Sequence, residues 1–307
     1  MRENTRPVNL YPELHCIDLR TKLAELHGID ADNIILGNGS DELLNFSFMA
    51  FCDDRKQAAF PNISYGFYPV YADLNHVPYT EIPLRPDFTI APEDYFDLHR
   101  TIFIANPNAP TGLALTRSQV EEILKHNRDS VVVIDEAYVD FGGETCIPLI
   151  KDYDNLLVVQ TFSKSRSMAG ARLGFAAGDK ALIADLNALK FSNNPYNVNS
   201  MTLALGLGVL LDEETTQANC RAIMDNRAYT TAELKKMGFE VLPSSANFIF
   251  AVSDRISSRE LYTKLKERNV LIRRFDKAGI ENWSRITIGT REQMDTLLSN
   301  VREILEG

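Results

Sequence analysis

Lys164 lies between two serines in the stretch TFSKSRSMAGAR, residues 161–172, and Arg172 follows eight positions later. The lysine comes directly after an apolar, strand-like run, so we expect it beside a ligand site, where partial desolvation favours a neutral, nucleophilic amine. Thr161 and Ser163 offer hydroxyl groups, and the planar guanidinium of Arg172 suits a phosphate. A lysine taken alone is more often a surface residue, but these neighbours favour a covalent one. Together they indicate an aldehyde cofactor that carries a phosphate, pyridoxal phosphate.

Such a cofactor needs a carboxylate beside its protonated ring nitrogen, and the stretch VVVIDEAY, residues 131–138, supplies one. Asp135 ends an apolar strand, and Tyr138 could donate a hydrogen bond to the cofactor's ring oxygen. The same pattern also describes the magnesium-binding strand of an ATPase. That alternative requires a preceding G-x-x-x-x-G-K-[ST] loop, which the sequence lacks.

Two further stretches could contact this cofactor. GNGSDE, residues 37–42, joins a short strand to a helix, so Gly39, Ser40 and Asp41 could present backbone N–H groups to a phosphate. An ordinary helix start capped by Ser40 would have the same sequence. In PNISYGFYPVY, Tyr65 lies at a predicted strand-to-helix junction, where its ring could stack on the cofactor or pack in the core.

The elements that must position these residues alternate between strands and helices. From about residue 33 to 180, β-branched runs (IIL, TIFIA, VVVI, LLVVQTF, RLGFAA) alternate with the amphipathic stretches SDELLNFSFMAF and SQVEEILKH. This order predicts an α/β fold with a mostly parallel sheet sandwiched by helices. Ligands bind at the carboxyl ends of such strands, and the polar stretches GNGSDE, NPNAPTG, DEAY and TFSK follow these runs.

After NNPYN the pattern changes. We expect helices around residues 200–236, then the strand-like runs FEVL, NFIFAV, VLIRRF and RITIG, interrupted by a helix and closed by EQMDTLLSNVREILE. The sequence therefore predicts a large cofactor-binding domain in residues 1–211 and a smaller α+β domain in residues 212–307. Because no low-complexity linker separates them, we expect a packed interface.

Composition restricts the partners. The 32 Lys and Arg residues against 42 Asp and Glu residues give a net charge of −10 without a basic stripe, which argues against nucleic acid and anionic membranes. The four cysteines and five histidines lack metal-ligand spacing, which predicts a reducing compartment and no structural metal. The opening MRENTRPVNLYPE has no apolar signal core. We expect a cytoplasmic protein that acts on small molecules.

Taken in order, these stretches resemble the fold-type I pyridoxal-phosphate aminotransferases, and among them the histidinol-phosphate aminotransferase subfamily. The resemblance runs from NLYPE through GNGSDELL, NPNAPTG, VVVIDEAYVDF, TFSKSRSMAGARLGF and SSANFIF to RITIGTRE. It implies a homodimer that exchanges the amino group between histidinol phosphate and 2-oxoglutarate in histidine biosynthesis.

The resemblance also implies a role for each candidate residue. Lys164 would bind the cofactor's aldehyde, and Asp135 would pair with the pyridine nitrogen. Tyr138 would hold the ring oxygen, while Tyr65 would stack on the ring. The residues around the phosphate would be Ser40, Asp41, Ser163 and Arg172.

Other positions concern the dimer and the substrates. Tyr11, in the LYP segment, matches a tyrosine that reaches across the dimer interface toward the neighbour's cofactor. Arg285 in RITIGT and Arg273 in VLIRRF match the arginines that bind the anionic groups of the substrates, although Arg274 competes for the second role. Arg273 and Arg274 could instead lie on a solvated edge strand.

Two features depart from the family pattern. Ala109 replaces the Asn that usually precedes PTG and contacts the cofactor's ring oxygen. Either Asn108 or Tyr138 takes over this contact, or the electronic properties of the cofactor's ring are less well adjusted. Family members also begin earlier, with an arm that helps to cover the substrate. Its absence would weaken substrate closure without affecting Lys164.

The implied mechanism gives Lys164 two tasks, as anchor of the cofactor and as the base that moves the α-proton, in a sheltered cleft that keeps its released amine neutral. Three alternatives remain. A threonine-phosphate decarboxylase or an aromatic amino-acid aminotransferase would use the same scaffold. A degenerate paralogue would bind the cofactor or a partner without turnover.

Overall fold

The fold is that of a computed structural model, which describes residues 9–307. Residues 1–8, the first part of the opening stretch MRENTRPVNLYPE, lie outside the described part. By the packing of its backbone the chain divides into two compact units. The large unit runs to residue 106 and resumes over 115–137 and 144–216, and the small unit comprises 107–114, 138–143 and 217–307. The predicted domain boundary after residue 211 stays a prediction.

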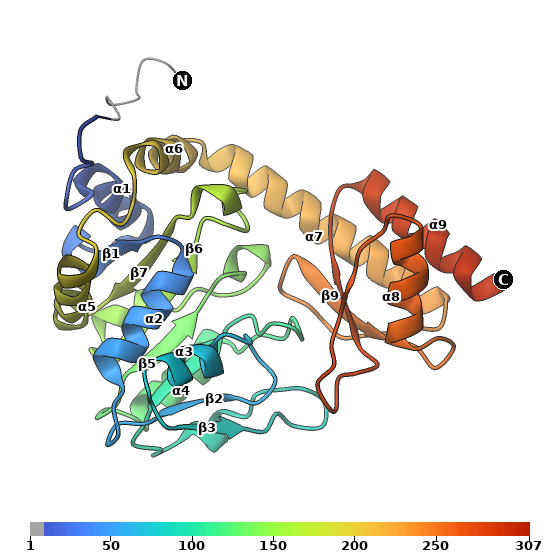
Figure 1. Cartoon of the computed structure of the whole chain (residues 1–307), viewed down its shortest axis with the longest axis horizontal. Coiled ribbons are helices and arrows are strands. Elements are labelled where there is room, and N and C mark those ends of the chain that lie inside the picture. Colours follow the sequence, from blue (N-terminus) through green and yellow to red (C-terminus); the bar gives the residue numbers. More distant parts are fainter. Residues whose placement is uncertain (1–8) are drawn as a thin grey trace. The chain divides into compact units, whose positions relative to one another are not determined.

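A seven-stranded sheet forms the centre of the large unit, with the strand order β1-β7-β6-β5-β4-β2-β3 (Figure 1). Neighbouring strands pair in parallel from β3 to β6, whereas β7 runs antiparallel to both β6 and β1. The predicted, mostly parallel sheet is confirmed. The strands are β1 (Ile34–Gly37), β2 (Ala58–Pro61), β3 (Tyr79–Ile82), β4 (Thr101–Ala105), β5 (Val132–Asp135), β6 (Leu156–Thr161) and β7 (Gly174–Gly178).

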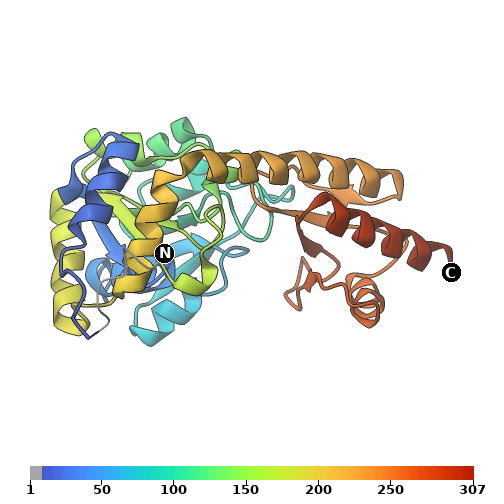
Figure 2. The ribbon, with the colours of Figure 1, turned by 90° about the horizontal axis from the view of Figure 1, so that it is seen from above.

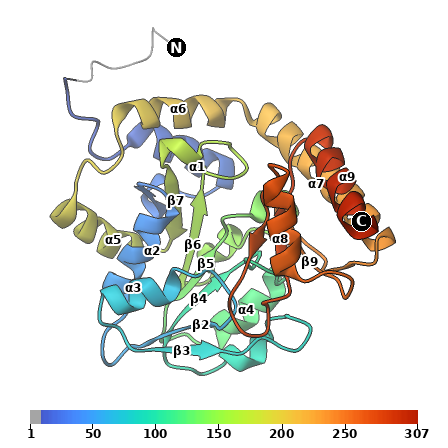
Figure 3. The ribbon, with the colours of Figure 1, turned by 45° about the vertical axis from the view of Figure 1, so that its right-hand side comes forward.

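Helices cover both faces of this sheet, because successive strand residues point to opposite sides and most of them are apolar. Ile102 and Ile104 of β4 pack in one buried cluster, and Phe103 between them packs in the other. The first face is covered by α1 (Ile17–His27), α4 (Arg117–Lys125) and α6 (Ser200–Leu211), and the second by α2 (Ser40–Phe51), α3 (Tyr68–Leu74) and α5 (Lys180–Asn193), as Figure 3 shows.

The small unit has a four-stranded antiparallel sheet with the order β10-β11-β9-β8. Its core joins Leu234 of α7, Leu261 of α8 and Leu298 of α9 to strand residues such as Ile249 and Ile286. Figure 2 shows α7 as one continuous helix. The elements are α7 (Glu213–Lys236), of which residues 217–236 belong to the small unit, and β8 (Glu240–Val241), β9 (Phe248–Val252), α8 (Ser258–Glu267), β10 (Arg273–Arg274), β11 (Ser284–Thr287) and α9 (Arg291–Glu306).

Short 3-10 helices complete the chain: η1 (Ala31–Asn33), η2 (Pro92–Tyr95), η3 (Val139–Phe141), η4 (Ile147–Lys151) and η5 (Ala169–Ala171). Across residues 9–307, every helix is too short or too polar to cross a membrane.

Candidate active site

Asp135 is a buried carboxylate at the end of β5, only 5% exposed. The strand alternation turns its side chain toward the face that carries α2 and α3. There the hydroxyl of Tyr68 donates to Oδ2 at 3.2 Å, and the backbone N–H of Ala137 donates to Oδ1 at 3.2 Å. Burial raises the pKa of Asp135 to about 6, although both hydrogen bonds and the charge of Lys164 act to lower it. Such a carboxylate is suited to a buried cationic partner.

The N-terminus of α2 lies close to Arg172. Gly39 is the N-cap residue of α2, with a φ of 81°. Because glycine has no side chain, it cannot accept a hydrogen bond from the N–H groups of the first turn of the helix. A Cβ atom on Gly39 would lie 2.6 Å from Nη2 of Arg172, and one on Gly174 would lie 2.6 Å from the backbone N of Ser40. Ser40 is the first residue of the helix, so the alternative in which it caps α2 does not hold. Helix N–H groups and a guanidinium here suit an anion.

Asp41 joins this group through its side chain. Its Oδ1 accepts from the hydroxyls of Tyr65 at 2.6 Å and Tyr71 at 3.2 Å, and its Oδ2 pairs with Arg172 at 3.0 Å. Burial, reinforced by Asp41, raises the pKa of Tyr65, so this phenol stays a donor. Because an anionic side chain does not attract a phosphate, we now expect Asp41 to orient Arg172 and Tyr65 and to offer a phosphate only its backbone N–H.

Lys164 lies in the turn that follows β6. The hydroxyl of Thr161 donates to Oγ of Ser163 at 2.9 Å, and the N–H of Ser163 donates back to Oγ1 of Thr161 at 3.1 Å, which fixes the start of this turn. Lys164 is exposed in the single chain, because the turn carries its side chain beyond the buried end of the strand. The sheltered cleft that the sequence predicts for it stays a prediction.

Asn108, Ala109 and Tyr138 belong to the small unit, although they lie near the large unit's strands in the sequence. Ala109 packs in an apolar cluster with Ala246 and Phe248, and the ring of Tyr138 contacts Phe248 edge-on at 5.0 Å. Asn108 is buried, and its amide donates to the hydroxyl of Thr111 at 3.2 Å. An Asn at position 109 would bring a polar amide into this apolar cluster.

Arg273 and Arg285 are direct partners across the β10–β11 pair, so two positive side chains share one face of the sheet. Burial lowers the pKa of Arg285, and among the described residues its buried Nε has no hydrogen-bond partner. Its guanidinium lies 5.0 Å from the ring centre of Phe248. Arg274 instead pairs with Asp276, so its charge already has a partner. Two arginines on one face, one of them with an Nε that is unpartnered within the described chain, suit an anion.

Tyr11 is 80% exposed near the start of the described chain. Its ring stacks on Tyr196, with 4.5 Å between the ring centres. This exposed aromatic pair belongs to the large unit.

Sequence reasoning missed Tyr68 and Tyr71. Both lie on α3 at three-residue intervals from Tyr65, a spacing that places side chains on one side of a helix and could have revealed them. Of the three phenols, those of Tyr65 and Tyr71 donate a hydrogen bond to Asp41, and that of Tyr68 donates to Asp135.

Glu136 is a second buried carboxyl that sequence reasoning passed over. Strand alternation turns it to the face opposite Asp135, where it accepts from the hydroxyl of Thr145 at 2.6 Å, the N–H of Cys146 at 2.5 Å and the amide of Gln160 at 2.8 Å. Burial raises its pKa to about 7 against these hydrogen bonds. Gln160 lies on β6, so Glu136 ties together the two strands that lead to Asp135 and Lys164.

Comparison with known proteins decides the family. The model of the aminotransferase class I and II family matches residues 2–301. The chain belongs to this family. Among similar aminotransferases, the histidinol-phosphate aminotransferase of Brachyspira hyodysenteriae is 46% identical over 307 residues, which are 100% of this chain and 87% of that protein. The Lactococcus lactis subsp. cremoris protein of the same name is 44% identical over 99% of this chain and 85% of its own length.

Solved aminotransferase structures share the fold. The histidinol-phosphate aminotransferase of Clostridium acetobutylicum superposes with a TM-score of 0.89 at 24% identity, over 97% of this chain and 91% of that chain. The Sinorhizobium meliloti enzyme, solved in complex with pyridoxal-5'-phosphate, also gives 0.89 at 21% identity, over 97% and 83%. At these identities the likeness concerns the fold alone.

This aminotransferase is a pyridoxal-phosphate enzyme, and its residues fit that cofactor. The buried Asp135 suits a protonated ring nitrogen, and the α2 N-terminus with Arg172 suits a phosphate. Within residues 9–307, no group of three or more His, Cys, Asp or Glu side chains is placed to hold a metal ion.

Proposed function

We propose that this aminotransferase transfers the amino group of histidinol phosphate to 2-oxoglutarate, a step of histidine biosynthesis, in the cytoplasm. The names of the relatives at 46% and 44% identity support this substrate pair. The observation that carries the proposal within the chain is the buried Nε of Arg285, which has no partner among the described residues. A phosphate or carboxylate on the substrate would supply that partner.

We assign the cofactor contacts as follows. Asp135 holds the protonated ring nitrogen, Tyr65 stacks on the ring, and Lys164 binds the aldehyde carbon. Tyr138 or Asn108 contacts the ring oxygen. The phosphate is held by the first turn of α2, starting at Gly39 and Ser40, together with Ser163 and Arg172.

The chemistry divides between the cofactor and the chain. Bound pyridoxal phosphate supplies an electron sink for the charge that remains when the substrate's α-proton is removed. Lys164 would hold the cofactor's aldehyde group and, with its amine free, would accept the α-proton and return it during the exchange. Asp135 would keep the ring nitrogen protonated. Arg273 and Arg285 fix the anionic groups of the substrates.

The donor preference tests this proposal. With 2-oxoglutarate as acceptor, we expect kcat/KM for histidinol phosphate to exceed that for phenylalanine, tyrosine or aspartate by roughly 10²-fold or more, because a site built for a phosphate donor pairs less well with the smaller, singly charged carboxylates of the other donors. A higher kcat/KM for an aromatic amino acid would support the aromatic aminotransferase. Release of CO₂ from threonine phosphate would support the decarboxylase, and no turnover with any donor would support the degenerate paralogue.

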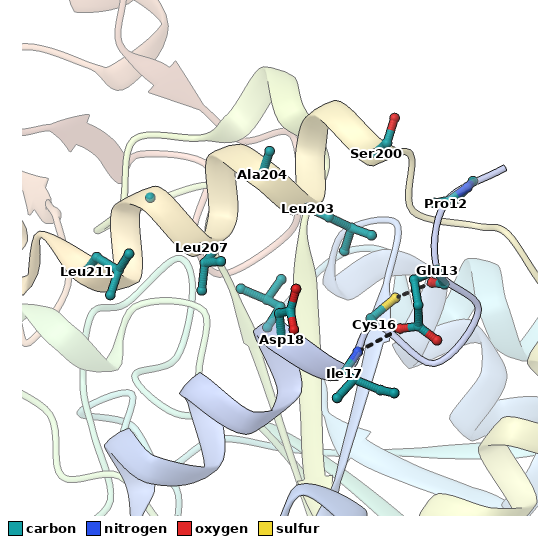
Figure 4. A pocket seen from close by; sticks show the side chains of 12 residues that line it. Pro12, Glu13, Cys16, Ile17, Asp18, Ser200, Leu203, Ala204, Leu207 and Leu211 are labelled. Carbon is teal, nitrogen blue, oxygen red and sulfur yellow. Dashed lines mark hydrogen bonds between the residues drawn. The ribbon is translucent and has the colours of Figure 1, made fainter. Parts of the chain in front are cut away.

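We further propose that the enzyme is a homodimer and that Tyr11 reaches the partner's cofactor. Apolar side chains are exposed along the N-terminal segment and α6: Leu10, Tyr11, Met201, Leu205 and Leu211. A cavity of about 330 Å³ lies between α1 and α6, and Figure 4 shows Ile17, Leu203, Leu207 and Leu211 around it. A second copy would cover this surface, and a two-fold dimer is the commonest arrangement of soluble oligomers.

Light scattering tests the dimer. At micromolar concentration we expect twice the single-chain mass of 34.5 kDa. Met201→Asp should shift the equilibrium toward the monomer, because it places a charge within the proposed interface. Leu74→Asp is the matched control, since Leu74 is also exposed and apolar but lies on α3, which covers the opposite face of the sheet. A fully active wild-type monomer would contradict the proposal.

A further inference from the structure

The hydroxyl of Tyr68 is directed at Asp135 by a rigid aromatic environment. Tyr68 is completely buried at the first position of α3. Its ring packs against Phe60 at 5.7 Å, Phe103 at 6.0 Å and, edge-on, Tyr65 at 5.6 Å between ring centres. With the ring held on several sides, the hydroxyl has little freedom to leave Oδ2 of Asp135.

Tyr68 differs from Tyr65 and Tyr71 in the carboxylate to which its hydroxyl donates a hydrogen bond. Tyr65 and Tyr71 both donate to Asp41, whose charge is also paired with Arg172. Tyr68 donates to Asp135, whose two oxygens accept only neutral donors in the hydrogen bonds described above. Burial raises the pKa of Tyr68 far above its usual value, so its hydroxyl keeps its proton at every pH where the enzyme works.

The strength of Asp135 as a base matters for catalysis. With pyridoxal phosphate bound, the carboxylate and the ring nitrogen would share one proton, and the ring is an electron sink only while that proton lies on the nitrogen. Burial makes Asp135 more basic and draws the proton toward the carboxylate. A hydrogen bond to Oδ2 stabilises the anionic carboxylate and opposes that effect.

We propose that Tyr68 is a positioning residue that stabilises the Asp135 carboxylate through Oδ2 and so keeps the shared proton on the cofactor's ring nitrogen. The inference rests on the proposed role of Asp135. Other titratable groups around the pair are Asp41 on α2, Tyr65 and Tyr71 beside it, and Lys164 after β6. Among these groups and Tyr68, it is Tyr68 whose side-chain hydrogen bond lowers the pKa of Asp135.

Tyr68→Phe removes the hydroxyl and leaves the ring in place. We expect kcat of the holoenzyme to fall about tenfold, the effect of one hydrogen bond to a charged group, with little change in KM for the donor. In the cofactor-free protein, the variant should lose stability relative to wild type as the pH rises through about 6. The lost hydrogen bond matters only when Asp135 is ionised, which happens in that range.

Tyr95→Phe is the matched control. Tyr95 is also fully buried, but its hydroxyl has no hydrogen-bond partner among the described residues, and it packs on the opposite face of the sheet. We expect this variant to keep the wild-type kcat and the wild-type pH dependence of urea unfolding. Both measurements are repeated for Tyr68→Phe in an Asp135→Asn background, where the pH-dependent difference should vanish.

The possible outcomes distinguish a failure of the Tyr68 inference from a failure of the proposed function. Unchanged kcat and unchanged pH dependence in Tyr68→Phe, with a normal wild type, would overturn this inference alone. So would an effect of equal size in the Asp135→Asn background, because Tyr68 would then act independently of Asp135. A wild-type protein that does not bind pyridoxal phosphate would overturn the proposed function and this inference with it.

Discussion

Replacing Lys164 with alanine is expected to reduce transamination by roughly 10³-fold or more, because one side chain serves as both cofactor anchor and proton carrier. The loss should be chemical. Lys164 is exposed and makes no contribution to either buried cluster, so the melting temperature of the cofactor-free variant should match that of wild type. Steady-state rates and thermal unfolding measure the two effects separately.

A covalent readout accompanies this prediction. Borohydride treatment of the wild-type holoenzyme should fix the cofactor irreversibly to the peptide that contains Lys164, and mass spectrometry should find no such label in Lys164→Ala. Lys180→Ala is the control, since Lys180 is an exposed lysine of the same unit that pairs with Asp30. Labelling of another lysine, or turnover above a few per cent of wild type in Lys164→Ala, would refute the assignment.

Asp135→Asn has the second largest expected effect. An amide cannot hold the ring nitrogen as an ion pair, so we expect the cofactor's affinity to fall roughly 10- to 100-fold, with a further loss of turnover. Fluorescence titration of the cofactor-free protein with pyridoxal phosphate measures the affinity. Equal affinity in the variant and the wild type would contradict the role of Asp135.

The same substitution should stabilise the cofactor-free protein above neutral pH. Burial raises the pKa of Asp135 from 3.8 to about 6, so the folded protein holds this proton more tightly than the unfolded chain does. The resulting stability is complete below about pH 4 and is lost as the pH rises through 6, by about 3 kcal/mol, since each pKa unit is worth about 1.4 kcal/mol. The amide introduced by Asp135→Asn does not titrate and escapes this loss.

Urea unfolding between pH 4 and pH 8 measures this difference. We expect the free energy of unfolding of Asp135→Asn to rise relative to wild type as the pH increases. Asp54→Asn, a change at an exposed aspartate, should show no such trend. A constant difference between Asp135→Asn and wild type across this range would show that the carboxyl titrates normally.

Local pattern was sufficient for much of the large unit. The runs TIFIA and SDELLNFSFMAF coincide with β4 and α2, because continuous apolar residues and a regular helical pattern mark buried elements directly. Asp135 and Lys164 could be singled out for the same reason, since both follow such runs. The direction of β7 was not predicted, because the connection from β6, residues 162–173, is long enough for either a parallel or an antiparallel neighbour.

The contacts between side chains depend on packing that the sequence does not display. Tyr68 reaches Asp135 only because α3 packs on the α2 face of the sheet beside the end of β5. Likewise, residues 107–114 pack with the small unit although they follow β4 directly. The contact of Ala109 with Phe248 joins residues that lie far apart in the sequence, so it has no local signal.

A single-turnover experiment tests the central claim most directly. The purified enzyme, saturated with pyridoxal phosphate and freed of excess, is mixed with histidinol phosphate in the absence of any oxo acid, and the visible absorbance of the cofactor is followed. We predict that the absorbance is lost once per active site with one equivalent of the keto phosphate formed, and that 2-oxoglutarate then restores it and yields one equivalent of glutamate. An absorbance that histidinol phosphate leaves unchanged, in an enzyme that responds to another amino donor, would contradict the proposed substrate.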